Sequence, residues 1–195
     1  MAKPFSVASW NVEHFKDDPN GARVNRVVDF LSAQRPDVFG LYEVEGATIF
    51  DALVERMPNY TFQITEGLQT QEILVGVKRT LTAFITQKTE FRSGTTHMRP
   101  GQLVTITNNG RNYCLLFLHL SSGSHPRGMG LRDDMLEPAF DLRKVLDRVG
   151  GGDGRARYIF LGDVNAMGLE YPFNKNIEAE VELKKWDRYA SFGSK

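Results

Sequence analysis

The sequence has little cysteine, no excess of charge of either sign and no long apolar run. Its 195 residues contain one cysteine, 24 basic residues and 24 acidic residues. A single cysteine excludes a disulfide framework, and Cys114 lies in the apolar run 113–118, so we expect it to be a small core residue. The balanced charge excludes the global positive field of many nucleic-acid-binding domains, but it leaves room for a local basic groove.

Two further absences concern membranes. No apolar stretch approaches the ~20 residues that a membrane-spanning helix needs, and the N-terminal residues lack the apolar core of a signal peptide. We therefore expect a cytoplasmic protein without a membrane span. The apolar fraction of 41% and the charged fraction of 25% are ordinary for a globular chain. Residues 1–195 are long enough for a single domain with a substantial core.

Two kinds of segment alternate along the chain. Short apolar runs rich in β-forming residues predict strands at 5–10, 37–42, 72–77, 103–107, 113–118 and 158–161. Apolar residues at helical spacing predict helices at 24–31, 50–57 and 142–149, and a fourth helix with fainter periodicity is expected at about 177–186. Asn109-Gly110 indicates a hairpin turn, and the glycines, serines and proline of 121–130 predict a loop. The pattern indicates one α/β domain with a mixed sheet.

Four of the predicted strands end in polar residues suited to metal or phosphate chemistry. Asn11, Glu43 and His119 directly follow three of them, and Asp163 and Asn165 follow the strand at 158–161. Ligands of open α/β sheets bind beyond the strand ends, so these residues can build one site. Each residue alone has a simpler interpretation, as a turn residue, a solvated carboxylate or a hydrogen-bonded core histidine.

Taken together, these residues carry a family resemblance. The segments SWNVE (9–13), GLYEV (40–44), LHLSSG (118–123) and LGDVN (161–165) resemble, in order and spacing, the motifs of the endonuclease/exonuclease/phosphatase family. That family includes DNase I-like nucleases, abasic-site endonucleases, sphingomyelinases and inositol polyphosphate phosphatases. The resemblance runs from about residue 5 to about residue 168. It implies a DNase I-like four-layer α/β sandwich, in which two mixed β-sheets pack face to face with helices on the outer faces.

The resemblance also implies a metal site. Glu43 resembles the glutamate that binds Mg²⁺, and Asn11 resembles the asparagine that supports this site. Glu13 occupies the place of a second acidic ligand in some members. Mg²⁺ prefers hard oxygen donors and takes only one or two carboxylates, which suits this set, and Mn²⁺ is the alternative cofactor. One cysteine and no clustered histidines exclude zinc chemistry based on these ligands.

The catalytic and phosphate-binding roles follow from the same resemblance. Asp163 resembles the aspartate that orients the attacking water, and Asn165 resembles the asparagine that holds the phosphate beside it. His119 and Arg99 resemble the histidine and the arginine that contact and neutralise the scissile phosphate. A bound cation and cationic side chains stabilise the charge that develops on phosphoryl oxygens. The expected activity is Mg²⁺-dependent hydrolysis of a phosphodiester, in a nucleic acid or in a small molecule.

Three departures from the family pattern modify this expectation. Tyr42 stands where glutamine is usual, and Val164 replaces a common phenylalanine, but neither side chain needs to touch the metal. The family closes with an Asp-His pair, and no Asp-His dipeptide occurs in this sequence. We therefore expect a domain truncated at its C-terminus, and loss of an acid/base group costs about 10²–10⁴ in rate.

Three interpretations of the missing pair remain open. The chain is a fragment of a longer enzyme, which we favour, or a second copy covers the exposed sheet by self-association. Otherwise the chain has kept the fold and lost the activity. The alternative function is then a non-catalytic module that binds a phosphorylated ligand or a protein.

Overall fold

Two four-stranded sheets make up the centre of the molecule. The computed structural model describes residues 5–165 except 17, 19, 68–70, 93–97, 123–125 and 151–155. The helix expected at 177–186 lies outside this part of the chain. The elements in order are β1 (Val7–Phe15), α1 (Ala22–Gln34), β2 (Val38–Val44), α2 (Ala47–Arg56), β3 (Tyr60–Ile64), β4 (Glu72–Lys78), β5 (Thr82–Lys88), the 3₁₀ turn η1 (Thr89–Arg92), β6 (Gly101–Asn108), β7 (Arg111–His119), α3 (Pro126–Val149) and β8 (Tyr158–Asp163).

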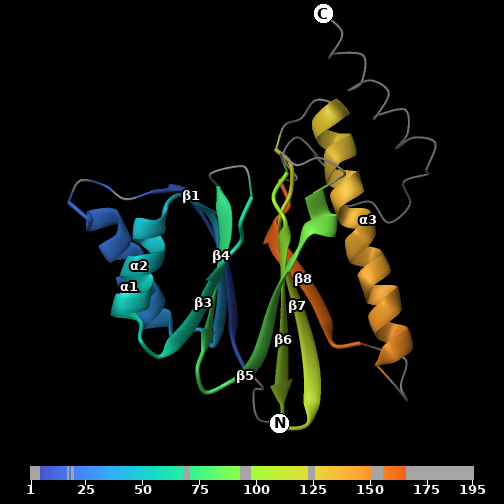
Figure 1. Cartoon of the computed structure of the whole chain (residues 1–195), viewed down its shortest axis with the longest axis horizontal. Coiled ribbons are helices and arrows are strands. Elements are labelled where there is room, and N and C mark those ends of the chain that lie inside the picture. Colours follow the sequence, from blue (N-terminus) through green and yellow to red (C-terminus); the bar gives the residue numbers. More distant parts are fainter. Residues whose placement is uncertain are drawn as a thin grey trace, which may run out of the picture.

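Both sheets are mixed, and their strand patterns mirror each other. The first sheet has the order β1-β2-β4-β3 and the second has the order β5-β6-β7-β8. In each sheet one outer pair is parallel, β1 with β2 and β7 with β8, and the other pairs are antiparallel. Figure 1 shows the layers: α1 and α2 lie outside the first sheet, and α3 lies outside the second. The expected four-layer sandwich is confirmed.

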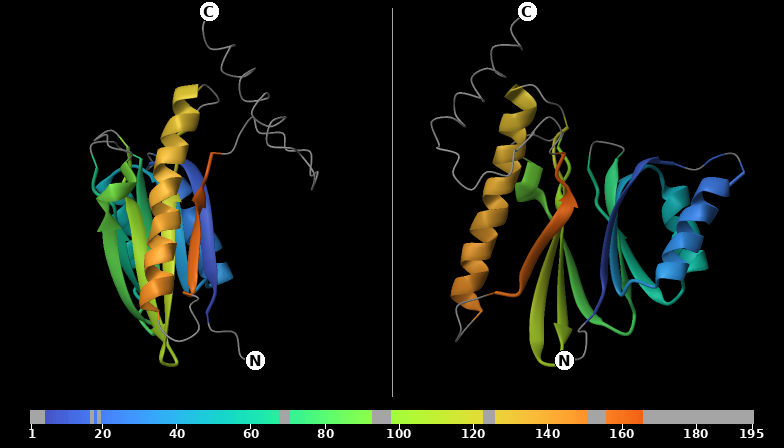
Figure 2. Two further views of the ribbon diagram at one scale, coloured as in Figure 1. Left: turned by 90° about the vertical axis from the view of Figure 1, so that its right-hand side faces the viewer. Right: turned by 180° about the vertical axis from the view of Figure 1, so that it is seen from behind.

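The helices attach to the sheets by apolar stripes at helical spacing. Val24, Val27, Val28 and Leu31 are the buried residues of α1, and they pack with apolar residues of β1, β2 and β4. Arg35 caps the C-terminus of α1: it has a left-handed backbone conformation, and its N–H donates to the Leu31 carbonyl. On the other side, α3 runs along the outer face of the second sheet, as Figure 2 shows. Its residues Met135 and Ala139 cover buried leucines of β7.

The space between the sheets is filled mainly by β-branched and aromatic side chains. This inter-sheet core contains side chains from β2, β4, β6 and β7, among them Val38, Val75, Val104, Leu115 and Phe117. Gly40 of β2 faces Phe117, because a Cβ at Gly40 would lie 2.4 Å from the ring carbon Cδ1. The absent side chain lets the two sheets approach closely at this point.

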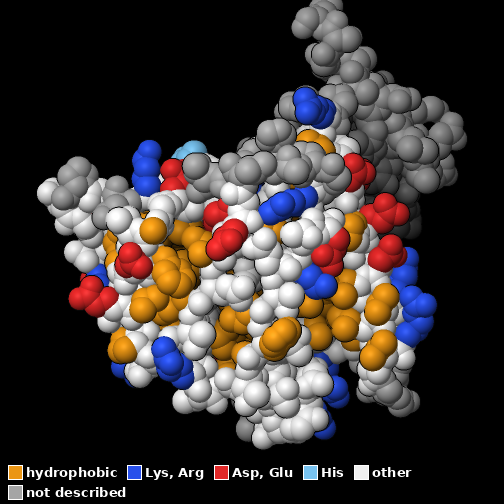
Figure 3. Space-filling view, viewed as in Figure 1, with side chains coloured by type: hydrophobic (Ala, Val, Ile, Leu, Met, Phe, Trp, Pro, Cys, Tyr) orange, Lys and Arg blue, Asp and Glu red, His pale blue; other side chains and the backbone are white. Residues whose placement is uncertain are grey.

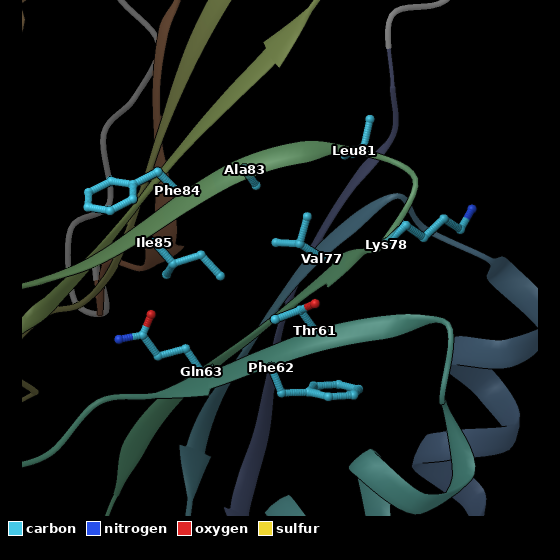
Figure 4. Close-up of a pocket in the computed structure, with 9 residues that line it drawn as sticks. All are labelled: Thr61, Phe62, Gln63, Val77, Lys78, Leu81, Ala83, Phe84 and Ile85. Carbon is cyan, nitrogen blue, oxygen red and sulfur yellow. The ribbon is translucent and has the colours of Figure 1, made fainter.

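At the far edges the sheets part around a groove. Strands β3 and β5 form these edges, and Figure 3 shows apolar side chains on this face of the molecule. Figure 4 shows the groove itself, into which Val77 and Ile85 project between the two strands. Phe84 on β5 is 71% exposed. Neither β3 nor β5 was predicted, because both are edge strands with several polar or exposed positions and therefore lack an apolar run.

The prediction of a loop at 121–130 was wrong from Pro126 onward, where α3 begins. A proline suits the first helical turn, since its missing N–H has no partner there in any helix. The helix also continues through Pro138, held by its apolar face. It has 24 residues, yet none of the helices in the described ranges is both long and apolar enough to cross a membrane.

Candidate functional site

The carboxyl ends of four strands meet at one edge of the sandwich. Asn11 lies on β1 and Glu43 on the neighbouring strand β2, while His119 and Asp163 are register partners at the ends of β7 and β8. Because each of these pairs of strands is parallel, both strands of a pair point their carboxyl ends the same way. The sheets face each other, so four residues that are far apart in sequence come together.

The Asn11 side chain lies at the centre of this group. Its nitrogen Nδ2 donates to Glu43 Oε1 at 2.9 Å and to Asp163 Oδ2 at 2.6 Å. Its oxygen Oδ1 accepts from the backbone N–H of Glu13 at 2.8 Å. A backbone N–H can only donate, so the amide oxygen must face it and the NH₂ group must face the carboxylates. Asn11 thus fixes two carboxylates that belong to different sheets.

The histidine completes a group that could hold a metal ion. His119 Nε2 lies 3.8 Å from Glu43 Oε1 and 4.0 Å from Asp163 Oδ2. One ligand atom from each of these three residues lies within 4.8 Å of the other two. Two carboxylates supply the hard oxygen donors that Mg²⁺ or Mn²⁺ prefers. The donor set of this chain therefore fits a divalent cation.

Burial and nearby charges determine whether His119 and Glu43 are ionised. Burial and the positive charge of Arg99 lower the pKa of His119 to about 4, against the opposing effect of the two carboxylates. The ring is therefore neutral at pH 7. Burial would raise the pKa of Glu43, but hydrogen bonds from Asn11 and from the His14 backbone N–H outweigh it and lower that pKa. The Glu43 carboxylate is therefore ionised.

Unusual backbone conformations gather at this edge. Of the six non-glycine residues with positive φ in the described ranges, four lie here: Glu13 (52°), His14 (45°), Glu43 (61°) and Asn165 (47°). The pairing registers of β1 and β2 also shift at this end, between Asn11 and Phe15 and between Leu41 and Val44. Such bulges redirect side chains next to functional sites, and the sheets around them support the strain.

Arg99 reaches the site through a residue that the sequence did not single out. Arg99 lies just before β6, and its Nε donates to the backbone oxygen of Gln71 at 2.5 Å, while its guanidinium also bonds the Gln71 side-chain oxygen. Gln71 Nε2 lies 3.5 Å from Glu43 Oε2 and 2.8 Å from His14 Nδ1. Burial lowers the pKa of Arg99, and Glu43 and Asp163 act against this effect. Gln71 thus joins a cation to the edge of the site.

Asp163 and Asn165 are held by the turn that follows β8. The backbone N–H of Asn165 donates to Asp163 Oδ1 at 2.9 Å, and Asn165 Nδ2 donates to the Leu120 carbonyl at 2.9 Å. Gly162 precedes this turn with φ 155°, and a Cβ there would lie 1.8 Å from the Leu118 carbonyl oxygen. Only glycine lets β8 approach β7 this closely before the two polar residues.

Two further residues of the motifs, Glu13 and Tyr42, lie outside the group of Glu43, His119 and Asp163 that could hold a metal ion. Glu13 lies on the bulge of β1 with an exposed side chain, and it is not among the three residues whose ligand atoms converge. Tyr42, which departs from the family pattern, is 1% exposed and packs its ring edge-on to His119 at 6.0 Å between centroids. Its hydroxyl lies 3.0 Å from Ser9 Oγ, so the polar end of this buried ring has a hydrogen-bond partner on β1.

Comparisons with known proteins match most of the chain to one family. The sequence model described as "Endonuclease/Exonuclease/phosphatase family" matches residues 8–176. Tyrosyl-DNA phosphodiesterase 2 of Xenopus tropicalis is 26% identical over 166 residues, which is 85% of this chain and 42% of that protein. The chain therefore spans less than half the length of this relative.

Solved structures show the same fold at lower identity. A crystal structure of humanized D. rerio TDP2 with 14 mutations matches with a TM-score of 0.64 and 22% identity, over 90% of this chain and 68% of that chain. ANGEL2, a 2′,3′-cyclic phosphatase solved with adenosine-2′,3′-vanadate, matches with a TM-score of 0.62 and 16% identity, over 83% of this chain and 53% of that chain. Similarity at these identities is evidence of a common fold.

Proposed function

The chain belongs to the endonuclease/exonuclease/phosphatase family, and from this we propose that it hydrolyses a phosphodiester with the help of Mg²⁺ or Mn²⁺. The observation that carries the proposal is the meeting of Asn11, Glu43, His119 and Asp163 at one edge of the sandwich. A carboxylate pair fixed by a shared amide donor, beside a buried imidazole and a nearby arginine, suits a dianionic or monoanionic phosphate together with a divalent cation.

The cation-binding role falls to the carboxylates. Glu43 would hold the ion, with Asn11 fixing the direction of its carboxylate and Asp163 beside it as a second oxygen donor. Such a cation supplies Lewis-acid stabilisation of the charge on the phosphoryl oxygens. Glu13 is the reserve ligand that the family resemblance offers, on the exposed bulge next to Asn11.

The remaining residues act on the water and the phosphate. Asp163 orients the attacking water, because its Oδ1 is held by the Asn165 N–H and its Oδ2 by Asn11. The buried Arg99 guanidinium stays cationic, since arginine does not lose its proton in proteins, and it neutralises the charge of the phosphate. Asn165, whose amide nitrogen also donates to the Leu120 carbonyl, binds the phosphate as a neutral donor. His119 Nε2 faces both carboxylates, so a neutral ring with its proton on Nε2 donates a hydrogen bond into the same space.

The first test is turnover of a generic phosphodiester. We expect Mg²⁺-dependent hydrolysis of bis(p-nitrophenyl) phosphate, and Asp163→Ala should lower kcat/KM by about 10²–10⁴. Asp141→Ala is the matched control, because Asp141 lies on α3 with a largely exposed side chain that pairs with Lys144. Equal rates in the wild type and in Asp163→Ala would remove the proposed mechanism. Binding of Mg²⁺ and nucleotide in calorimetry without any turnover would instead favour a non-catalytic module.

The substrate class is the second part of the proposal. The Xenopus tropicalis relative is named a tyrosyl-DNA phosphodiesterase, and one similar D. rerio structure was solved with a single-strand DNA product. We therefore place a phosphodiester at a DNA end first among the substrates, and the balanced charge of the chain keeps small phosphodiesters second. Cleavage of a tyrosyl-DNA conjugate at a higher kcat/KM than bis(p-nitrophenyl) phosphate supports this order, and the reverse ratio contradicts it.

Self-association belongs to the same proposal. Within the described part of the chain strand β8 is an edge of its sheet, and its Ile159 side chain is 51% exposed. A second copy that covered this edge would remove the exposed apolar surface from water. Size-exclusion chromatography should then show a dimer that Ile159→Lys converts to a monomer, and an unchanged elution volume of the variant argues against this interface.

A further inference from the structure

Gln102 is a polar side chain in an otherwise apolar layer. It lies on β6 between the two sheets and is 0% exposed, and among the described residues neither its Oε1 nor its Nε2 has a hydrogen-bond partner. Leaving both ends of a buried amide unpaired costs free energy, whereas a leucine of similar size would fill the space at no such cost. We therefore expect the Gln102 amide to have a polar neighbour.

The strand register identifies that neighbour. Gln102 pairs with Phe117 across the antiparallel strands β6 and β7, and His119 is two residues further along β7. Val104 and Phe117 belong to the inter-sheet core, while Leu103 and Leu116 pack under α3, so alternation places Gln102 and His119 on the inter-sheet face. Diagonal neighbours on one face lie within reach of a long side chain.

His119 lacks a partner at the matching atom. Its Nε2 faces the carboxylates of Glu43 and Asp163, but its Nδ1 is buried and has no hydrogen-bond partner in the part of the chain that the structure describes. Since Nε2 is turned toward Glu43 and Asp163, Nδ1 is the ring atom that faces away from them, and this buried nitrogen needs a polar partner.

We propose that the Gln102 amide N–H is this partner and that it donates to His119 Nδ1 directly or through one buried water. The terminal torsion of glutamine is soft, so the amide can turn its N–H toward the ring. Gln102 then acts as a positioning residue: it keeps His119 in the neutral Nε2–H form, which presents a donor to the scissile phosphate. The catalytic meaning of this contact rests on the proposed phosphodiester hydrolysis, but the contact itself does not.

Nitrogen spectra of the histidine ring test the contact without an activity assay. In ¹⁵N-histidine-labelled protein at neutral pH without added metal, we expect His119 to show the Nε2–H form with a hydrogen-bonded Nδ1. Gln102→Leu should shift the Nδ1 signal toward that of an unbonded acceptor and populate the Nδ1–H form. It should also lower kcat about 10- to 100-fold, as loss of a partner that orients a functional histidine does.

Gln87→Leu is the matched control. Gln87 is the register partner of Gln102 on β5, but its amide bonds the backbone of Glu66, so this variant should leave the His119 signals unchanged. If Gln102→Leu does not fold, Gln102→Met repeats the test with a flexible side chain of similar length. Identical ring signals in the wild type and in the Gln102 variant overturn the proposal, as does an Nδ1–H form in the wild type. Shifted signals in a protein without turnover support it and count only against the proposed function.

Discussion

The Asn11 amide nitrogen lies 2.6 Å from Asp163 Oδ2, although the two residues belong to different sheets and are 152 positions apart. The same nitrogen holds Glu43, so one NH₂ group is shared by two carboxylates at the mouth of the sandwich. Hydrogen bonds to ionised acceptors are stronger than those between neutral groups. The contact therefore joins the sheets and also sets the geometry on which the proposed chemistry depends.

Replacing Asn11 should affect activity more than stability. Asn11→Ala removes both carboxylate contacts and leaves two negative groups without their shared donor. We expect a loss of about 1–3 kcal/mol in the free energy of unfolding and a fall in kcat/KM of about 10²-fold, the range for loss of an orienting group. Urea unfolding and phosphodiesterase assays measure the two effects. Asn112→Ala, on an exposed part of β7, is the control: it loses one exposed hydrogen bond from the Thr107 hydroxyl, so it should leave activity unchanged and cost less stability than Asn11→Ala.

Replacing Gly162 should disturb the position of Asp163 without changing any polar residue of the site. A Cβ at this residue would lie 1.8 Å from the Leu118 carbonyl oxygen, so Gly162→Ala forces β8 away from β7 next to Asp163. We expect a loss of at least about 1–3 kcal/mol, as for other overpacked sites, together with a loss of activity. Gly130→Ala is the opposite control: the site is open and helical, so this variant should gain up to about 1 kcal/mol. Equal stability of the two variants in urea unfolding would contradict this account of Gly162.

The sequence predicted the parts of the fold that depend on local pattern. Buried strands such as β2 and β7 are apolar runs, and α1 shows its apolar stripe at helical spacing, so both were recognisable. The edge strands β3 and β5 were missed, because an edge strand needs no continuous apolar run. The first half of α3 was missed because glycine and proline favour loops locally, whereas packing of Met135 and Ala139 against the second sheet holds the helix.

In the site, too, some residues could be predicted from local sequence pattern and others depend on how the sheets pack. Asn11, Glu43, His119 and Asp163 could be recognised because each follows a predicted apolar strand in a motif, and the family to which those motifs pointed is confirmed. Their individual roles stay predictions. Gln71 carried no such signal, because it precedes a strand and its contacts come from residues distant in sequence. Contacts of this kind depend on how the sheets pack, which residue patterns do not specify.

Binding of a divalent cation should stabilise the folded chain. A ligand that binds only the native state raises stability by about 2.7 kcal/mol when its concentration is 100 times Kd. We therefore expect Mg²⁺ and Mn²⁺ to raise Tm in a thermal melt and EDTA to reverse the rise. Glu43→Gln should abolish the rise, because it removes the ionised carboxylate that Asn11 fixes. Glu45→Gln, at a carboxylate two residues further along the chain that bonds His14, should retain the rise. A Tm that does not respond to either cation argues against the metal site.

The Asp37 carboxylate, at the opposite end of β2 from Glu43, predicts how the stability of the fold depends on pH. Asp37 accepts hydrogen bonds from the Ser6 backbone N–H at 2.7 Å, from the Ser6 hydroxyl at 2.8 Å and from Lys78 Nζ at 2.8 Å. Burial would raise the pKa of Asp37, but the bonds from Lys78 and Ser6 outweigh it and lower that pKa. These contacts tie the start of β1 to β2 and β4.

The sign of the effect follows from that direction. A carboxyl whose folded pKa lies below its unfolded value of about 3.9 stabilises the fold above that pH, and the stabilisation is lost as the pH falls through the folded pKa. Asp37→Asn should therefore cost about 1–2 kcal/mol at pH 7, with allowance for partial solvent screening. The difference from the wild type should shrink in urea titrations below about pH 4. Asp29→Asn, whose pair with Arg56 is largely exposed, should show almost no difference at either pH. A gap between Asp37→Asn and the wild type that stays constant from pH 7 to pH 3 would contradict the assignment of this stability to the ionised carboxylate.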